Sequence, residues 1–322
     1  MNFSNKGIVL ISILLIVLLL SAIAVTFGNK YLLSLKRAQY IEFQSLSLNT
    51  FGNIEELALM KIDKSLRFNS NQLSKENLLF KEKLNFNVNG AEIIGTIQDA
   101  SNCFNINSLV KKNKNNFEEN KKSTDAFRKY MNSVDIDTYV IEEIIDQIID
   151  WIDSDSNPRE YGLEDYYYTG PLHSPKEYSG GRLFIDIEEL KSIPAIRQVD
   201  WKIFGNHFCA YSFESSLKIN INTIDYDDLL FLNSVFPNMD LKDTEYILQN
   251  IPVGGFKSLS SMKQTFQDID LSQANAEISF TSNVFDIETT IQFENFFSSS
   301  KSIIIYGNNK KGYIVSRIYT GI

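Results

Sequence analysis

The sequence predicts an α+β protein in which a long amino-terminal helix packs on an antiparallel sheet and an all-α unit is inserted between two strands. Three observations support this class. An apolar run, Ile8 to Phe27, passes into an amphipathic stretch, with no proline before Pro158. Strand-like alternation occurs at 82–99 and returns only at 284–320. Helical periodicity dominates the residues between these two regions.

The apolar run is the first element. At about 1.5 Å per residue it spans about 30 Å, the thickness of one bilayer core. Three interpretations compete. It could be a secretory signal, because Ala22-Ile23-Ala24 resembles a cleavage site that would leave Val25 as the mature amino terminus. It could be a plain membrane anchor. It could also follow a prepilin-type leader cut after Gly7, so that the helix stays on the mature protein.

The residues after the run favour the third interpretation. Apolar side chains continue at spacings of three and four, as at Phe51, Ile54, Ala58, Ile62 and Leu66. An apolar half-helix therefore continues into an amphipathic half-helix, and the two together span about 55 to 60 residues. The flanking charges do not help: Lys30, Lys36 and Arg37 follow the run and Lys6 alone precedes it, which opposes export of the remainder under the positive-inside rule.

The composition excludes several classes. A net charge of −9 and a pI near 4.9 argue against a nucleic-acid partner, which needs clustered Lys and Arg. Two cysteines, Cys103 and Cys209, are too few for a metal knuckle; outside the cytoplasm they would form a disulfide, and free buried thiols are the alternative. His173 and His207 lack a partnered nucleophile motif, and no Gly-rich nucleotide loop follows a strand, so we expect no enzyme and no small-molecule substrate.

The sheet is predicted from five strands. Lys83–Val88 and Ala91–Ile97 form a hairpin across Asn89-Gly90. The remaining strands are expected at Val284–Phe293, Ser302–Tyr306 and Tyr313–Tyr319, with Gly307–Gly312 as the last loop. Together they would cover the amphipathic half of the first helix.

The insertion is expected to be a compact helical bundle. It opens with a polar stretch, Lys111–Lys122, which predicts an exposed loop. A helix over Tyr139–Ile152 carries an isoleucine stripe, with Ser133 or Asp135 as its cap. Shorter helices are expected at Asp186–Ile193, Pro194–Phe204, Asp225–Val235, Lys242–Asn250 and Ser258–Phe266.

The densest polar constellation follows that helix, between Asp150 and Tyr168. Carboxylates crowded at a helix carboxyl terminus repel one another, and a hard cation relieves this cost. The residues at positions 1, 3, 5 and 12 of an EF-hand-like loop are Asp153, Asp155, Asn157 and Glu164. Pro158 stands where such a loop needs Gly, so the loop is not an EF-hand although its oxygen ligands suit calcium. Asp150 and Asp165 are further candidate ligands that could complete a paired site of one or two Ca²⁺ ions. The alternative is a solvated acidic loop, or a calcium-dependent hydrolase for which no nucleophile is evident.

This loop carries a specific resemblance. Asp150 to Pro158, Gly162 and Glu164 to Tyr167 resemble the signature of the K minor pseudopilins of type II secretion (general secretion pathway protein K). Other segments resembling this family fall in the same order: Cys103–Leu109, Phe184–Leu190 and Lys218–Thr223. The resemblance covers nearly the whole chain.

The resemblance implies a pilin-like fold and a set of roles. Residues 1–7 would be the leader, 8–29 the transmembrane half of the helix, 30–104 with 282–322 the pilin-like unit, and 105–281 the helical insertion. A prepilin peptidase would cut between Gly7 and Ile8 and methylate Ile8. The protein would be a single-pass inner-membrane protein with a periplasmic domain, placed with other minor pseudopilins at the tip of a short filament. A disulfide would join Cys103 to Cys209.

Ser12 has a physical interpretation of its own. It is the fifth residue from Ile8, where ordinary pilins carry a Glu that pairs with the amino terminus of the preceding subunit. A subunit with nothing ahead of it needs no such carboxylate, which fits a tip position. A type IV pilus minor pilin with a similar insertion remains an alternative.

A rival from another class is an exported helix-hairpin-helix DNA-binding protein. Ile219–Ile224 and Gly255–Leu259 resemble parts of that motif, which grips phosphate through a Gly-rich hairpin. Here the hairpin, Asn233–Asn238, contains no glycine. We therefore interpret this segment as the same helical scaffold without a phosphate-binding hairpin.

Overall fold

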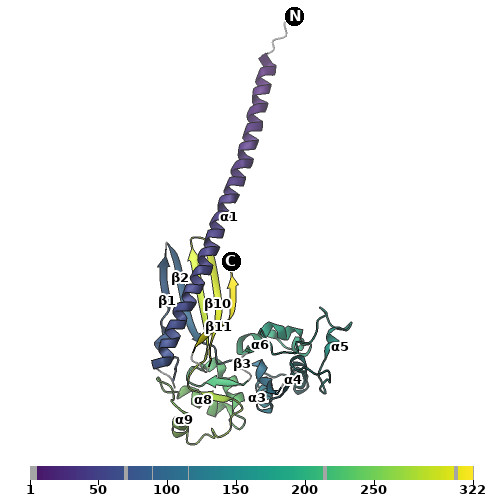
Figure 1. Ribbon diagram of the computed structural model, residues 1–322, viewed down its shortest axis with the longest axis vertical. Helices are drawn as coiled ribbons and strands as arrows, with labels where there is room; N and C mark the ends of the chain where they lie inside the picture. Colours follow the sequence, from purple (N-terminus) through teal and green to yellow (C-terminus); the bar gives the residue numbers. More distant parts are fainter. Residues whose placement is uncertain are drawn as a thin grey trace.

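The computed structural model describes residues 6–68, 72–88, 90–114, 116–212, 216–307 and 311–321. Most of the expected leader (1–5), the turn residue Asn89 and the loop residues 308–310 lie outside this set. Figure 1 shows one long helix standing beyond a sheet, with the insertion attached to the far end of that sheet.

Helix α1 (Lys6–Phe68) is continuous over 63 residues, as the unbroken pattern predicts. Its outer part is exposed on every side from Val9 to Glu42. Its inner part buries the predicted stripe against the sheet: Phe51, Ile54, Ala58 and Ile62 are each at most 2% exposed. Among the described residues, α1 is the helix that is long and apolar enough to cross a membrane.

The sheet has five antiparallel strands in the order β1-β2-β9-β10-β11. Their bounds are β1 (Leu84–Val88), β2 (Ala91–Asp99), β9 (Val284–Phe293), β10 (Phe296–Tyr306) and β11 (Gly312–Thr320). Strand β9 pairs directly with β2, and Asp99 lies opposite Phe285. The chain therefore leaves for the insertion and returns at the same end of the sheet, and the predicted α+β, pilin-like fold is confirmed.

The interface between α1 and the sheet contains a buried carboxylate with a half-exposed arginine partner, as well as apolar side chains. Glu55 on α1 is 2% exposed, and its Oε1 accepts a hydrogen bond of 2.9 Å from Arg317 Nε on β11 and one of 2.6 Å from Ser302 Oγ on β10. Ser298 Oγ bonds Ser47 Oγ at 2.8 Å. Because these bonds are directional, they fix the rotation of α1 on the sheet.

The insertion forms its own apolar core around two helices, α3 (Lys121–Ser133) and α4 (Thr138–Ile152). Shorter helical elements surround them: α5 (Asp165–Tyr168), η2 (Ile187–Ser192), η3 (Ala195–Gln198), α6 (Trp201–His207), η4 (Tyr226–Asp228), α7 (Leu229–Val235), α8 (Leu241–Gln249) and α9 (Leu259–Thr265). The expected helical insertion is thus present, and its isoleucine stripe on α4 is buried.

Three details of the insertion correct the sequence predictions. It is not purely helical, because three strand pairs occur in it: β3 (Phe104–Asn105) with β6 (Phe208–Cys209), β4 (Val110–Asn113) with β5 (Asn116–Glu119), and β7 (Lys218–Asn220) with β8 (Glu277–Ser279). The expected loop Lys111–Lys122 is mostly the β4–β5 hairpin, whose exposed lysines and asparagines give no apolar alternation. The cap of α4 is Asp137, which accepts from Tyr139 N–H at 2.8 Å, and not Ser133 or Asp135.

The segment after α1 ties the two units together. Leu73 N–H donates to Phe280 O at 2.8 Å, and Leu73 O accepts from Asn220 Nδ2 at 3.1 Å. Lys75 N–H donates to Asn222 O at 3.2 Å. A short helix, α2 (Leu78–Lys81), then leads the chain into β1. The segment between α1 and α2 is therefore bonded to the insertion.

Candidate metal site

The acidic site is built where α4 ends. Asp153 is the C-cap residue of α4, and its backbone N–H donates to Ile149 O at 2.9 Å. The chain then loops outward and returns at Glu164, the N-cap of α5, whose side chain makes no capping bond. The loop thus brings a carboxylate from each of its two ends to one place.

Three carboxylates meet there. Oxygens of Asp153, Asp155 and Glu164 all lie within 4.8 Å of one another. Glu164 is 4% exposed, and Glu164 Oε1 and Asp153 Oδ1 are buried without a hydrogen-bond partner among the described residues. Buried polar atoms are normally satisfied, and an all-oxygen donor set suits a hard cation. This cluster can therefore hold a metal ion.

The electrostatics of the metal-free site are unfavourable. Burial, with the neighbouring Asp155 charge, raises the pKa of Asp153 to about 6. Burial and the charges of Asp150 and Asp153 raise the pKa of Glu164 to about 7. Like charges close together in a desolvated place disfavour ionisation. A bound cation would reverse this effect and keep the carboxylates ionised.

The remaining candidate ligands lie around the cluster with partners of their own. Asp150 is fully buried, its Oδ2 accepts from Arg159 N–H at 3.0 Å, and burial raises its pKa to about 7. Asp165 Oδ1 accepts from Ser179 N–H at 2.7 Å and Ser179 Oγ at 2.8 Å. Asn157 is exposed, and its N–H donates to Asp155 Oδ1 at 2.9 Å. These residues thus shape the loop around the three clustered carboxylates.

A glycine lets Asp150 reach the loop. A Cβ atom at Gly162 would lie 1.8 Å from Asp150 Oδ2 and 2.9 Å from Arg159 N, both impossible contacts. Only a residue without a side chain fits between this carboxylate and the backbone that it caps. Gly162, one of the residues that carry the family resemblance, therefore has a direct steric role: it leaves room for the Asp150 carboxylate.

Arg159, which the sequence pattern does not single out, anchors the loop to the bundle. Arg159 Nε lies 2.6 Å from Asp146 Oδ1 on α4, and its guanidinium also lies 2.7 Å from Glu119 Oε2 on β5. The signal available was a single arginine within an acidic run. Its partners could not be inferred, because Glu119 belongs to a hairpin that was predicted as a loop.

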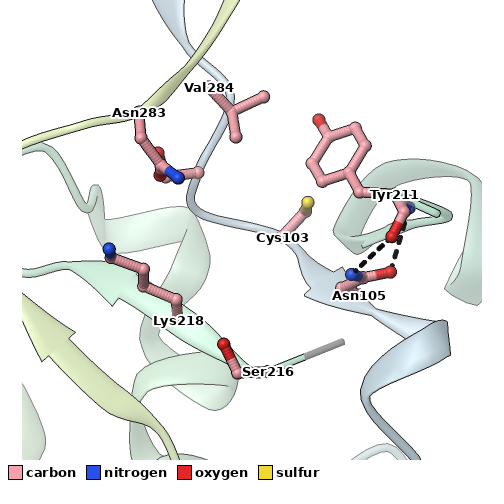
Figure 2. A pocket seen from close by; sticks show the side chains of 8 residues that line it. Cys103, Asn105, Tyr211, Ser216, Lys218, Asn283 and Val284 are labelled. Atoms are coloured by element: carbon pink, nitrogen blue, oxygen red, sulfur yellow. Dashed lines mark hydrogen bonds between the residues drawn. The ribbon is translucent and has the colours of Figure 1, made fainter. Parts of the chain in front are cut away.

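The two cysteines form a disulfide, the pairing that the resemblance implied, with 5.8 Å between their Cα atoms. It joins the segment before β3 to β6. A cavity of about 20 Å³ lies beside Cys103 at the junction of the two units. Figure 2 shows Tyr211, Lys218 and Asn283 around it. A cavity of this size holds about one water molecule and no organic ligand.

Asparagine side chains hold the insertion together in a repeated way. In each case the amide donates to the carbonyl and accepts from the N–H of one distant residue, as a neighbouring strand would. For Asn107 and Phe184 the two bonds are 2.9 and 2.8 Å. The pairs are Asn102 with Asn220, Asn105 with Tyr211 (Figure 2), Asn107 with Phe184, and Asn222 with Phe256. Two of the segments that resemble the family, Cys103–Leu109 and Lys218–Thr223, thus supply structural cross-links.

The hairpin between α7 and α8 is unsuited to phosphate. Lys129 Nζ donates to Phe236 O at 2.7 Å and to Met239 O at 2.9 Å. Two carbonyls of the hairpin thus face a cation of the same chain, whereas a phosphate grip needs amides facing outward. This geometry argues against the DNA-binding alternative.

Both histidines have acidic neighbours. His173 is buried and its Nε2 lies 2.6 Å from Glu177 Oε1, while His207 Nδ1 lies 3.7 Å from Asp228. Both lie within the insertion.

Comparisons with known proteins agree on one family. A family model described as type II secretion system (T2SS), protein K matches residues 102–212, which contain the acidic loop and both cysteines. Type II secretion system protein K of Aeromonas hydrophila is 21% identical over 98% of this chain and 97% of its own length. The proteins of that name from Klebsiella pneumoniae and Pectobacterium carotovorum subsp. carotovorum are 22% identical over 94% and 93%, and 31% identical over 56% and 56%, of the two chains.

A solved structure shares the fold. A chain in the crystal structure of the GspK-GspI-GspJ complex from the type 2 secretion system of enterotoxigenic Escherichia coli superposes with a TM-score of 0.75. The alignment covers 88% of this chain and 99% of that chain at 20% identity. The insertion and the sheet thus recur together in another protein.

Proposed function

The chain belongs to the type II secretion system protein K family, and from that premise we propose that it is a minor pseudopilin with a structural role in protein export. The observation that carries the proposal is full-length agreement: relatives of this name align over 93% and 97% of their own length. The fold supports it, because a long helix with an exposed apolar half and a buried amphipathic half suits a subunit that moves from membrane to filament. The role is one of assembly and not of catalysis.

We propose that the outer half of α1 anchors the protein in the inner membrane, with the sheet and the insertion in the periplasm. The leader, residues 1–7, is cut between Gly7 and Ile8, and Ile8 is then methylated. Residues 8–29 span the bilayer, 30–104 with 282–322 form the pilin-like unit, and 105–281 form the insertion. The continuous helix supports this division, because it needs no hinge at the membrane surface.

The partners follow from the solved relative. The GspK chain in that structure is in a complex with GspI and GspJ. We propose that this chain assembles with the corresponding two minor pseudopilins at the filament tip. Ser12 is consistent with the tip position, because a first subunit has no preceding amine to pair with a carboxylate.

The acidic cluster is proposed to bind Ca²⁺, as one ion or two. Asp153, Asp155 and Glu164 supply the oxygens that meet within 4.8 Å, and Asp150, Asn157 and Asp165 are the further candidates beside them. The ion would supply positive charge to carboxylates that otherwise repel one another. The chain's part is to fix the two ends of the loop, so that the insertion presents a defined surface.

Co-purification tests the assembly. The tagged full chain, co-expressed with the neighbouring minor pseudopilins, should recover both in a stable complex. Recovery of neither, or recovery of type IV pilus subunits instead, would contradict the proposal and favour the pilus alternative.

Titration calorimetry tests the metal. Asp153→Ala with Glu164→Ala should lower the affinity for calcium at least about 100-fold, because two of the ligands are lost. The matched control is Glu160→Ala, which removes an exposed carboxylate of the same loop and should bind as wild type. Both variants should still be exported across the membrane. Equal loss in the control would mean that the loop acts only through its total charge.

A further inference from the structure

The basic residues that follow the membrane helix lie on one side of α1. At about 100° per residue, Lys30, Lys36 and Arg37 fall within about 120° of arc. All three are exposed, and so are the apolar side chains between and around them, including Tyr31 (69%) and Tyr40 (41%). Figure 1 shows this part of α1 beyond the sheet. We call Lys30, Lys36 and Arg37 the basic arc.

The basic arc has no acidic partner within the part of the chain that the structure describes. The sequence contains no Asp or Glu before Glu42, and the three side chains form no ion pair among the described residues. Farther down the same helix the pattern differs: Lys61 pairs with Glu82 at 3.1 Å and Arg67 with Asp63 at 2.9 Å. In a chain of net charge −9, this uncompensated positive segment is unusual.

Its place matches the headgroup layer of a bilayer. If 8–29 fill the hydrocarbon core, Lys30 lies at its boundary and Arg37 about 10 Å farther along the axis. Side chains of a helix point toward its amino terminus, so these long stems extend back toward the membrane. Tyr31 is of the type that settles at membrane interfaces.

In the proposed orientation, the basic arc lies on the exported side of the membrane. Basic residues on the exported side oppose the usual charge bias of membrane insertion. A favourable interaction on that side would offset this cost. Resting on the proposed anchoring, we propose that the basic arc binds anionic phospholipid headgroups of the periplasmic leaflet and holds the subunit at the membrane until it is extracted into the filament.

Lipid selectivity tests this binding. The full chain is reconstituted into vesicles of phosphatidylglycerol and phosphatidylcholine, and spin-labelled lipids report which headgroup is retained at the protein. Wild type should prefer phosphatidylglycerol on the order of 3- to 10-fold, and about 1 M salt should weaken the preference. Lys30→Gln, Lys36→Gln and Arg37→Gln together should bring the preference near unity.

The matched control removes the same residue types from the same helix. Lys61→Gln, Lys64→Gln and Arg67→Gln lie about 46 Å farther from the membrane and should keep the preference. No preference in wild type, or an unchanged preference in the basic-arc variant, would overturn the proposal. If the variant with an unchanged lipid preference also fails to co-purify with the other minor pseudopilins, the basic arc is a protein contact.

Carbonate extraction of the same vesicles separates this result from the proposed function. A carbonate-resistant protein without lipid selectivity would contradict the basic arc alone. A protein that carbonate removes would contradict the membrane anchor itself, and the basic arc with it.

Discussion

The pilin-like unit and the insertion are each stabilised internally by different interactions. Among the described residues, the pilin-like unit consists of the long α1, the short α2 and five strands, joined along a buried apolar stripe. Around α3 and α4, the insertion is assembled from shorter helices and from strand pairs of two to four residues. It compensates with specific cross-links: paired asparagine amides, a disulfide and the Arg159 network. Regular elements carry their own order, whereas short ones need particular side chains to fix them.

This comparison makes the insertion the unit that single chemical changes should loosen. Both tryptophans, Trp151 and Trp201, lie in the insertion. Tryptophan fluorescence therefore reports its unfolding, and hydrogen exchange of β9 and β10 reports the sheet.

The largest effect is expected from the disulfide. Cys103→Ala with Cys209→Ala should lower the free energy of unfolding by about 2–5 kcal/mol, because the bond closes a long loop in the unfolded chain. Urea unfolding followed by tryptophan fluorescence measures this loss. A loss below about 1 kcal/mol, or an equal loss of protection in β9 and β10, would contradict the assigned role.

Next comes a paired asparagine. Asn107→Leu leaves the N–H and C=O of Phe184 buried without partners and should destabilise the insertion by about 2–4 kcal/mol. Asn238→Leu is the control, because Asn238 is exposed and makes no side-chain hydrogen bond among the described residues. Similar midpoints for the two variants in urea would show that the amide pairs are dispensable.

A smaller change should affect the other unit. Arg317→Gln removes the partner of the buried Glu55 carboxylate and should cost the sheet about 1–3 kcal/mol, since Arg317 itself is half exposed. Faster hydrogen exchange in β10 and β11, with an unchanged tryptophan midpoint, is the expected result. Lys61→Gln, which breaks the exposed pair with Glu82, is the control and should change little. A shifted tryptophan midpoint would mean that the two units unfold together.

A further effect is expected from pH. In the metal-free protein, folded Asp153 and Glu164 have pKa values of about 6 and 7, above unfolded values near 4. The folded state therefore binds more protons in this window, so the stability of the insertion should fall as the pH rises from about 4.5 to 7.5. Saturating calcium should weaken this fall, and Asp153→Asn with Glu164→Gln should reduce it without abolishing it, because burial also raises the pKa of Asp150 to about 7. A metal-free stability that rises over the same window would contradict these shifts.

The same contrast explains what the sequence could predict. The long helix and the sheet follow from periodicity and turn chemistry, which are local. The β4–β5 hairpin cannot be predicted in this way, because the residues of β4 after Val110 are all exposed and show no apolar alternation. The sequence favours Ser133 or Asp135 as the cap of α4, whereas the structure shows that Asp137, adjacent to the first turn, is the cap.

The candidate site divides in the same way. Spacing along the loop sufficed to single out Asp153, Asp155 and Glu164, which the structure brings together. It could not show that Asp150 bonds the backbone at Arg159 or that Asp165 bonds Ser179. These hydrogen bonds depend on the close approach of Asp150 to the backbone, which Gly162 allows, and on loops that return from elsewhere in the insertion.

In the proposed function, a calcium ion fixes the insertion while the pilin-like unit stands without it. Hydrogen exchange of the full chain, measured with calcium and with chelator, separates the two units. Calcium should increase protection around α4, the acidic loop and α5, and should leave β2, β9 and β10 unchanged. Equal protection in both conditions, or a change centred on the sheet, would contradict it.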